Sequence, residues 1–241
     1  MSYPSWSYRF YQWCWSGLDW LFPPVCGGCG TIGTRWCINC QRQVTKITEP
    51  LCKSCGIPQA TTGLCSNCHS KPPTFRSLRS WLVFEGPIRD ALHRLKYRRD
   101  VGLGEALVKE FAHYSIDLNW SIDIVVPVPL GKKRLKERGY NQAELIAHPL
   151  ALALGLRYTR NALFRIRETA SQVGLGLYQR RENVREAFSG RAGYVRGMNI
   201  LVVDDVATTG STLDACAHAL LNVDAKNVYC ITIARALPHY S

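Results

Sequence analysis

Residues 200–212 read Ile-Leu-Val-Val-Asp-Asp-Val-Ala-Thr-Thr-Gly-Ser-Thr, and this stretch decides the fold class. Its four leading apolar residues are typical of a buried strand in a parallel sheet. Two carboxylates follow at the carboxyl end of that strand, where parallel sheets bind their ligands. A loop of small hydroxylated residues and glycine then opens a predicted helix over residues 211–221. Free N–H groups at the start of this helix, with the hydroxyls of the loop, predict a phosphate-binding cradle.

The acidic pair in this loop is suited to sugar hydroxyls and, directly or through water, to Mg²⁺. A bare helix cap or a metal site of another kind is the alternative interpretation. The order of strand, acidic pair, glycine turn and helix favours the phosphate site. The predicted ligand-binding residues, with the two aspartates also the catalytic candidates, are Asp204, Asp205, Val206, Ala207, Thr208, Thr209, Gly210, Ser211 and Thr212.

Strands and helices alternate around this loop. The alternation predicts an α/β fold with a parallel, twisted sheet flanked by helices. We expect a proline to interrupt one of the helices at His148-Pro149. The remaining strands are predicted over residues 78–84, 122–128, 157–166 and 227–234, and the remaining helices over 87–98, 104–114 and 141–154.

Four C-x-x-C pairs precede the α/β region and hold eight of the eleven cysteines. A C-x-x-C turn supplies two thiolates, so two turns complete a tetrahedral zinc site. Short spacings within each half favour two sequential sites, although spacing alone leaves crossed pairing open. A redox role suits one such motif rather than four in a row, and disulfides need an oxidising compartment. The predicted ligands are Cys26, Cys29, Cys37 and Cys40 for one zinc, and Cys52, Cys55, Cys65 and Cys68 for the other.

The formal net charge of +12 is concentrated in residues 121–200, which hold fourteen Lys and Arg against six acids. This excess predicts an anionic partner, either a polyphosphate or a nucleic acid, with a merely soluble basic surface as the alternative. The sequence has no run of about 18 apolar residues and no secretory leader, which predicts a cytoplasmic protein without a transmembrane segment.

The sequence divides into three predicted parts. Residues 1–24 are rich in aromatic rings and predict a helix. We expect this helix to pack on the protein, with an interfacial helix on a membrane as the alternative. Residues 25–73 form the cysteine-rich double zinc-ribbon module and end in a Lys-Pro-Pro linker. Residues 74–241 form the α/β domain.

Residues 204–212, called the ligand loop below, resemble the phosphoribosyl pyrophosphate (PRPP) loop of type I phosphoribosyltransferases. In those enzymes this loop binds the ribose and 5-phosphate of PRPP with Mg²⁺. The resemblance implies that an earlier strand ends in a pyrophosphate-binding loop, and that a mobile loop covers the substrate. The implied pyrophosphate-loop residues are Pro127, Val128, Pro129, Leu130, Gly131, Lys132 and Arg134, with Lys133 beside them. The implied mobile-loop residues are Arg165, Arg167, Thr169, Gln172, Arg181 and Asn183.

Over residues 26–235 the chain resembles the ComF family, which includes GntX-like members. The resemblance rests on the cysteine pairs, the PRPP loop and short motifs, among them His-Arg-Leu-Lys-Tyr at 93–97 and Arg-Gly-Tyr-Asn-Gln at 138–142. It implies a bacterial protein of natural transformation, in which incoming single-stranded DNA is handled at the inner membrane with DNA-uptake machinery proteins. No settled reaction accompanies the family. The motif residues are Lys96, Arg138, Gly139, Tyr140, Asn141 and Gln142.

Several functions remain open at this point. Purine salvage is disfavoured, because those relatives carry an aspartate where this chain has Thr208. A glutamine amidotransferase is disfavoured, because a metal module replaces the glutaminase domain. The favoured function is a PRPP-binding competence protein, and the alternative is an active phosphoribosyltransferase of small-molecule metabolism that transfers the phosphoribosyl group to an unknown acceptor and releases pyrophosphate. Exposed rings such as Tyr140 next to the basic region would suit single-stranded DNA. A scaffold for membrane or transport machinery is the third possibility.

Overall fold

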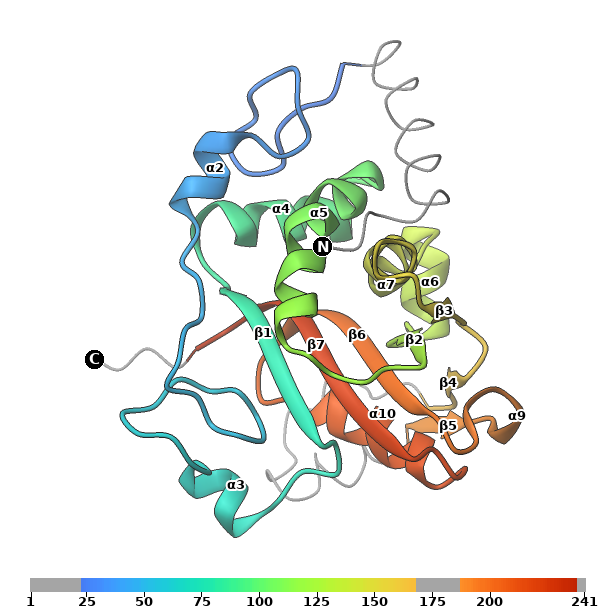
Figure 1. Ribbon diagram of the computed structural model, residues 1–241. Helices are drawn as coiled ribbons and strands as arrows, with labels where there is room; N and C mark the ends of the chain where they lie inside the picture. The colour runs from blue at the N-terminus through green and yellow to red at the C-terminus, as the bar shows by residue number, and fades with distance from the viewer. Residues whose placement is uncertain (1–22, 168–186, 238–241) are drawn as a thin grey trace, which may run out of the picture.

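The computed structural model describes residues 23–167 and 187–237 (Figure 1). A five-stranded sheet forms the centre of the molecule, and every neighbouring pair in it is parallel. The predicted parallel α/β sheet is therefore confirmed. In spatial order its strands are β1 (Ser77–Val83), β7 (Asn227–Arg235), β6 (Asn199–Ala207), β2 (Ile124–Pro127) and β3 (Arg157–Tyr158). A separate antiparallel pair consists of β4 (Leu163–Arg165) and β5 (Phe188–Gly190).

Helices cover both faces of the sheet, because the central strands are apolar on both sides. On β6, Ile200 and Val202 pack into one buried cluster, while Leu201 and Val203 pack into the other. The first cluster contains α10 (Ser211–Leu221). The second contains the long helices that lie on the opposite face in Figure 1, namely α4 (Gly86–Tyr97), α5 (Gly102–Asp117) and α7 (Gln142–Leu154). The shorter helices are α2 (Ile38–Gln43), α3 (Ser66–Ser70), α6 (Lys132–Arg138) and α9 (Ala192–Val195).

Two of the predicted elements are wrong in detail. Helix α7 runs through Pro149 without a break, because this proline is buried and the helix packs tightly on α5. At the contact, a Cβ added to Gly104 would lie 2.6 Å from the carbonyl oxygen of Leu145, the group that Pro149 leaves without its helical donor. The strand predicted over residues 157–166 is instead two strands in different sheets. The chain turns between them, where Asn161 N–H donates to the hydroxyl of Thr159.

Strand β6 is longer than predicted and continues through the acidic pair to Ala207. Pairing with β7 explains the extension, since Asp204 lies opposite Thr232 and Ala207 lies opposite Arg235. The aspartates are therefore held by a sheet register rather than by a loop. This rigid support is what a site that must position charge requires.

The two halves of the cysteine-rich module lie on different parts of the α/β domain (Figure 1). The first half packs on α4 and α5, where a Cβ added to Gly27 would lie 2.6 Å from Leu103 Cδ2. The second half joins the buried cluster on the α10 side through Cys52, Cys55 and Cys68. Its backbone also accepts a 2.8 Å hydrogen bond at Ser54 O from the N–H of Leu78 in β1.

Several predictions fall on other parts of the chain. Except for Pro23 and Pro24, the predicted aromatic helix lies outside the described residues, as do Thr169, Gln172, Arg181 and Asn183. Within the described residues, no helix combines the length and the hydropathy needed to cross a bilayer.

Candidate functional site

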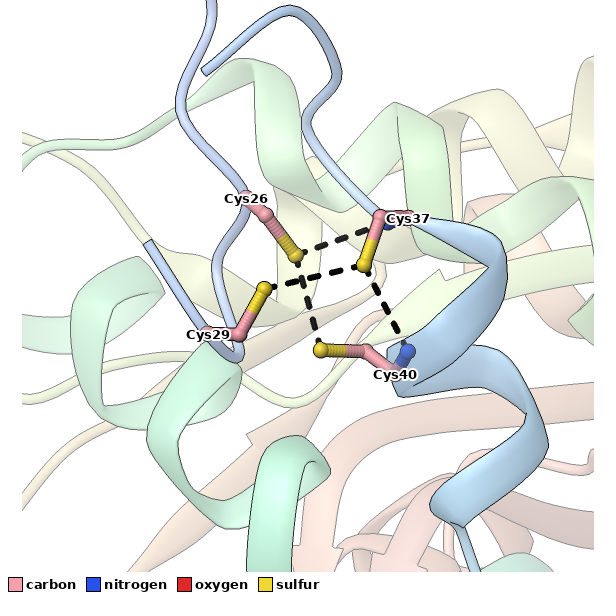
Figure 2. Close-up of side chains that lie close together, drawn as sticks. All are labelled: Cys26, Cys29, Cys37 and Cys40. Carbon is pink, nitrogen blue, oxygen red and sulfur yellow. Dashed lines mark hydrogen bonds between the residues drawn. The ribbon is translucent and has the colours of Figure 1, made fainter. Parts of the chain in front are cut away.

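Each half of the cysteine-rich module brings four thiols together. The sulfur atoms of Cys26, Cys29, Cys37 and Cys40 lie within 4.8 Å of one another, and those of the second four cysteines do the same. Figure 2 shows the first group, in which Cys26 and Cys40 come from different turns and their Sγ atoms are 3.6 Å apart. A tetrahedron with Zn–S bonds of about 2.3 Å has S···S edges of about 3.8 Å, so the groups fit zinc closely.

Backbone N–H groups point at these sulfurs, as expected for thiolates. The N–H of Cys37 donates to Cys26 Sγ at 3.4 Å, and the N–H of Cys65 donates to Cys52 Sγ at 3.3 Å. A hydrogen bond with Thr31 lowers the pKa of the exposed Cys29 thiol to about 6, which favours the ligating form. The sequential grouping predicted from spacing is confirmed, and both groups are structural zinc sites.

The ligand loop forms a small cradle at the start of α10. Gly210 has a φ of +81°, a left-handed conformation that turns the chain from β6 into the helix. The hydroxyls of Thr209 and Ser211 are 2.8 Å apart, and the N–H of Ser211 donates to Thr209 Oγ1 at 3.3 Å. A cavity of about 40 Å³ is lined by residues 206–213 together with Asp204. Hydroxyls, helix N–H groups and a carboxylate therefore meet at one small hollow.

The two aspartates at this cradle have different surroundings. Asp204 is half-buried, and its withdrawal from water together with the neighbouring Asp205 carboxylate raises its pKa well above the usual range. Asp205 is only 3% exposed and forms an ion pair with Lys96 Nζ at 2.5 Å. Gln142 Nε2 donates to the other oxygen of Asp205 at 3.4 Å. Asp205 is thus fixed by protein groups, while Asp204 faces the cradle cavity.

The motif at residues 138–142 supports this arrangement. Gly139 ends α6 in the left-handed conformation, and Arg138 donates to Gln142 Oε1 at 2.9 Å. Asn141 caps α7 by accepting from Ala143 N–H, and its amide donates to the carbonyl of Val128 at 2.9 Å. One short motif therefore connects the end of β2 to the carboxylate of the ligand loop. The sequence identified these residues as a family motif but did not predict their contacts with the ligand loop.

Tyr140 is not the exposed ring that the sequence suggested. It is half-buried, and its hydroxyl donates to the carbonyl of Leu95 at 2.5 Å, which fixes α4 against the motif. The exposed ring in this region is that of Tyr97, with 66% of its surface accessible. The guanidinium of Arg138 lies 4.9 Å from the centre of that ring.

The implied pyrophosphate loop leaves the sheet beside the acidic pair. Pro127 is paired with Val203, and the N–H of Val128 donates to Val203 O at 2.9 Å, so this loop starts next to Asp204. Gly131 is the N-cap of α6. The basic residues that follow lie on an exposed helix without a buried residue, and they are Lys132, Lys133, Arg134 and Lys136. The loop is near the acidic pair, while its positive charges face solvent.

The two described members of the implied mobile loop lie at the end of β4. The guanidinium of Arg165 stands 5.5 Å from the centre of the Phe188 ring, and its Nε donates to Arg167 O at 3.3 Å. Their role at the ligand site stays a prediction.

Sequence reasoning missed Arg235, which ends β7 directly beside the ligand loop. Its side chain is 3% exposed and donates from Nη1 to the carbonyl oxygen of Cys55, a zinc ligand of the second ribbon. Together with residues 208–211 it lines a cavity of about 430 Å³ between the second ribbon and the ligand loop. The available signal was an arginine at the carboxyl end of an apolar strand, which is the edge that binds ligands.

Comparisons with known proteins agree with this two-part architecture. Residues 17–69 match the model of the "Double zinc ribbon domain", and residues 103–239 match that of the "Phosphoribosyl transferase domain". The chain is 34% identical to "DNA utilization protein YhgH" of Salmonella typhimurium, over 83% of this chain and 90% of the relative. It is 29% identical to "Competence protein ComFC" of Bacillus subtilis, over 83% and 84% of the two chains.

A third relative is "Competence protein F" of Haemophilus influenzae, 28% identical over 83% of this chain and 90% of its own. Among solved structures, an adenine phosphoribosyltransferase aligns with 58% of this chain and 72% of its own at 21% identity, with a TM-score of 0.37, and no conclusion rests on it. The family models cover both parts of the molecule, and the relatives extend over most of its length. The chain belongs to the ComF family, and it joins a double zinc ribbon to a phosphoribosyltransferase domain.

Proposed function

We propose that this protein binds PRPP with Mg²⁺ at residues 204–212. The observation that carries the proposal is the union of a half-buried carboxylate, two hydroxyls and the start of α10 in one hollow. The cradle would hold the 5-phosphate through N–H groups and hydroxyls. The acidic pair would hold the ribose hydroxyls, with Lys96 and Gln142 keeping Asp205 in place.

The carboxylate oxygens at this site are the donors that Mg²⁺ prefers, so the residues fit the ion. When bound, Mg²⁺ would neutralise the pyrophosphate and the acidic pair. The chain's own contribution is to orient the ribose at β6 and to present Pro127–Pro129, which begins beside Asp204, to the leaving group. Positioning and charge neutralisation are most of what phosphoribosyl transfer requires.

The biological role we propose is in natural transformation and DNA use. The relatives carry the names "Competence protein ComFC", "Competence protein F" and "DNA utilization protein YhgH", and they align over most of both chains. The proposed setting is the cytoplasmic side of the inner membrane, where incoming single strands and the uptake machinery meet. The alternative is an active phosphoribosyltransferase of small-molecule metabolism that releases pyrophosphate.

Calorimetric titration of Mg-PRPP tests the proposal directly. Saturable binding to wild type should be lost in Asp204→Asn/Asp205→Asn, because the ribose and the cation lose their carboxylates. The matched control is Asp90→Asn/Asp117→Asn, which removes the same charge at exposed positions of α4 and α5. A folded, zinc-loaded wild type that does not bind Mg-PRPP would contradict the proposal, as would equal binding by the two double variants.

A second candidate function is direct contact with single-stranded DNA on α6. Its side chains are exposed and mostly basic, and the exposed ring of Tyr97 lies beside Arg138. Basic side chains would follow the phosphates while the ring stacks on a base. Oligothymidine affinity should fall with salt, and Lys132→Ala/Lys136→Ala should reduce the log–log slope by about 1.4, or ~0.7 for each lost contact. A slope that the double variant leaves unchanged would exclude α6 as the contact.

A further inference from the structure

We propose that the 430 Å³ cavity between the second zinc ribbon and the ligand loop is the acceptor site, and that it takes a planar ring with a carboxylate edge. The proposal rests on PRPP binding at the ligand loop. Thr208, Thr209, Gly210 and Ser211 line both this cavity and the phosphate cradle, so the two hollows share one wall. An acceptor in the larger hollow would therefore lie next to the bound ribose phosphate.

The surroundings of Arg235 indicate that the acceptor carries a negative charge. This arginine is buried between the second zinc group and the cavity, and its Nη1 donates to the carbonyl oxygen of Cys55. Its Nε–H is buried and has no acceptor among the described residues. A buried donor without a partner is costly, and a guanidinium is best satisfied by the two oxygens of a carboxylate. The guanidinium of Arg235, which belongs to the lining of the cavity, is thus a group that an anionic ligand would complete.

The zinc group offers a simpler explanation of this arginine, and that explanation is incomplete. Zn²⁺ with four thiolates has two net negative charges, which would stabilise a nearby guanidinium. The hydrogen bond to Cys55 O fits this role. The neutralising role does not explain why Arg235 borders a cavity of this size, because an arginine that only neutralised the zinc group could lie in a filled core. The volume is in the range of about 300–1,000 Å³ that ligand pockets occupy.

The walls of the cavity indicate the shape of the ligand. Pro72 and Pro73 line the cavity with apolar rings, the buried Phe75 adds an aromatic ring, and Ile57 adds an apolar side chain from the ribbon. Lys71 adds a second positive charge to the lining, and the one acid among the described lining residues, Asp214, already accepts from the N–H of Thr74. Apolar and aromatic rings together with two cations in one lining favour a planar ring that carries a negative group. An extended or bulky aliphatic acceptor would not use these surfaces.

The reaction at this site would join the ring to the ribose. A ring nitrogen would use its electron pair to form a bond to ribose C1, while the bond from C1 to the pyrophosphate oxygen breaks. Pyrophosphate would leave with that electron pair, and a nitrogen that started as N–H would release its proton to water. Arg235 would hold the carboxylate and so orient the nitrogen, which makes it a substrate-binding residue. No oxidant or further reactant is needed.

Saturation-transfer NMR on the full zinc-loaded chain tests the site, with nicotinate and orotate as probes and nicotinamide as the neutral analogue. Both carboxylates should receive saturation from the protein, and nicotinamide should bind about tenfold more weakly, or ~1.4 kcal/mol. Arg235→Gln should abolish the carboxylate signal. Zinc content and Mg-PRPP affinity are measured on the same variant, so a lost ribbon is recognised as such.

A second variant keeps the test decisive if Arg235→Gln loses zinc. Ile57→Trp fills the cavity from the ribbon side and should abolish probe binding while Mg-PRPP still binds. The control is Ile32→Trp, at a position of the first ribbon that is 74% exposed, which should change neither. Probes that fail to bind wild type, or that still bind Ile57→Trp, would overturn the proposal. The probes are titrated with and without Mg-PRPP, so failure of PRPP binding is seen separately.

Discussion

The two zinc groups of this protein have the same ligands and different neighbours. The first lies on α4 and α5, and its Cys29 is exposed. In the second, Cys52, Cys55 and Cys68 are buried in the cluster that contains α10, and Cys65 is partly buried against it. One group fastens a peripheral segment to the outer helices. The other forms a wall beside the loop that we propose to bind PRPP. The same metal chemistry thus supports two different tasks.

The contacts of the second ribbon explain why it should matter for ligand binding. The N–H of Thr74 donates to Asp214 in the first turn of α10 at 2.5 Å. Phe75 and Leu78 are the nearest side chains to Gly210, the residue that turns the ligand loop. Arg235 joins the ribbon to the end of β7. The loop is therefore supported from the ribbon side as well as by the sheet.

Removing each zinc group in turn gives the largest expected difference. Cys52→Ser/Cys55→Ser should lose one zinc, lower the free energy of unfolding by more than about 3 kcal/mol, and weaken Mg-PRPP binding at least ~tenfold. Cys26→Ser/Cys29→Ser should also lose one zinc but leave that affinity within about threefold, or ~0.7 kcal/mol. Zinc analysis, urea unfolding and calorimetry measure these effects. Equal losses of affinity would end the distinction between the ribbons.

A pair of equivalent glycines provides a finer comparison. Gly30 and Gly56 follow the first and third cysteine pairs and both have positive φ. A Cβ at Gly30 would meet nothing within 4 Å, whereas one at Gly56 would collide with the carbonyl oxygen of Leu78. Gly30→Ala should therefore cost only the left-handed strain of about 1–2 kcal/mol. Gly56→Ala should cost roughly 3–4 kcal/mol in urea unfolding, because the ribbon must also move away from β1.

A chelator should remove the two zinc ions at different rates. Cys29 is exposed in the first group, while the second has three buried ligands and one half-buried ligand. A coloured zinc chelator should remove one equivalent about tenfold faster than the other, and Mg-PRPP binding should survive the first release. Mass spectrometry of rapidly alkylated protein would identify the opened group. Fast alkylation at Cys52 or Cys55 would reverse the assignment.

The smallest expected effect concerns the contribution of Asp204 to the stability of the fold. Burial and Asp205 raise the pKa of Asp204, so the folded state holds this proton more tightly than the unfolded state does. The contribution of Asp204 to the free energy of unfolding therefore falls as the pH rises, starting above the pKa of Asp204 in the unfolded state and continuing through its pKa in the folded state. At neutral pH, Asp204→Asn should raise the melting temperature by about 2–4 °C, as expected for ~1 kcal/mol, while Mg-PRPP binding is lost.

The check is to compare melting temperatures across pH. The advantage of Asp204→Asn should disappear in acid, where the wild-type carboxyl is protonated in both states. Asp90→Asn, at an exposed position of α4, should show no such pH dependence. A variant that is less stable than wild type at neutral pH would show that the Asp204 charge stabilises the fold.

Local patterns in the sequence predicted the cysteine grouping, the parallel sheet and the position of the ligand loop. Each of these depends on neighbours within a few residues, such as two turns that share a zinc or an apolar run that ends in acids. The length of β6 and the continuity of α7 were missed, because both are decided by partners elsewhere in the chain. Arg235 was missed as a site residue, and Lys96 was named as a motif residue without its partner, for the same reason. Lys96 reaches Asp205 from α4, and Arg235 contacts the zinc ligand Cys55 only because the second ribbon lies beside the end of β7.

The place of β1 in the sheet has a consequence for how the protein is made. Within the described residues this strand lies at the end of the sheet order, where it pairs with β7, the last described strand, while an isolated bridge joins its Leu82 to Lys46. The second ribbon, which comes directly before β1, cannot reach its final seat until nearly the whole polypeptide has left the ribosome. Pairing of segments so distant in sequence is slow and leaves an edge uncovered meanwhile. Early zinc loading would keep the waiting ribbon compact, so metal supply during translation would govern the yield of folded protein.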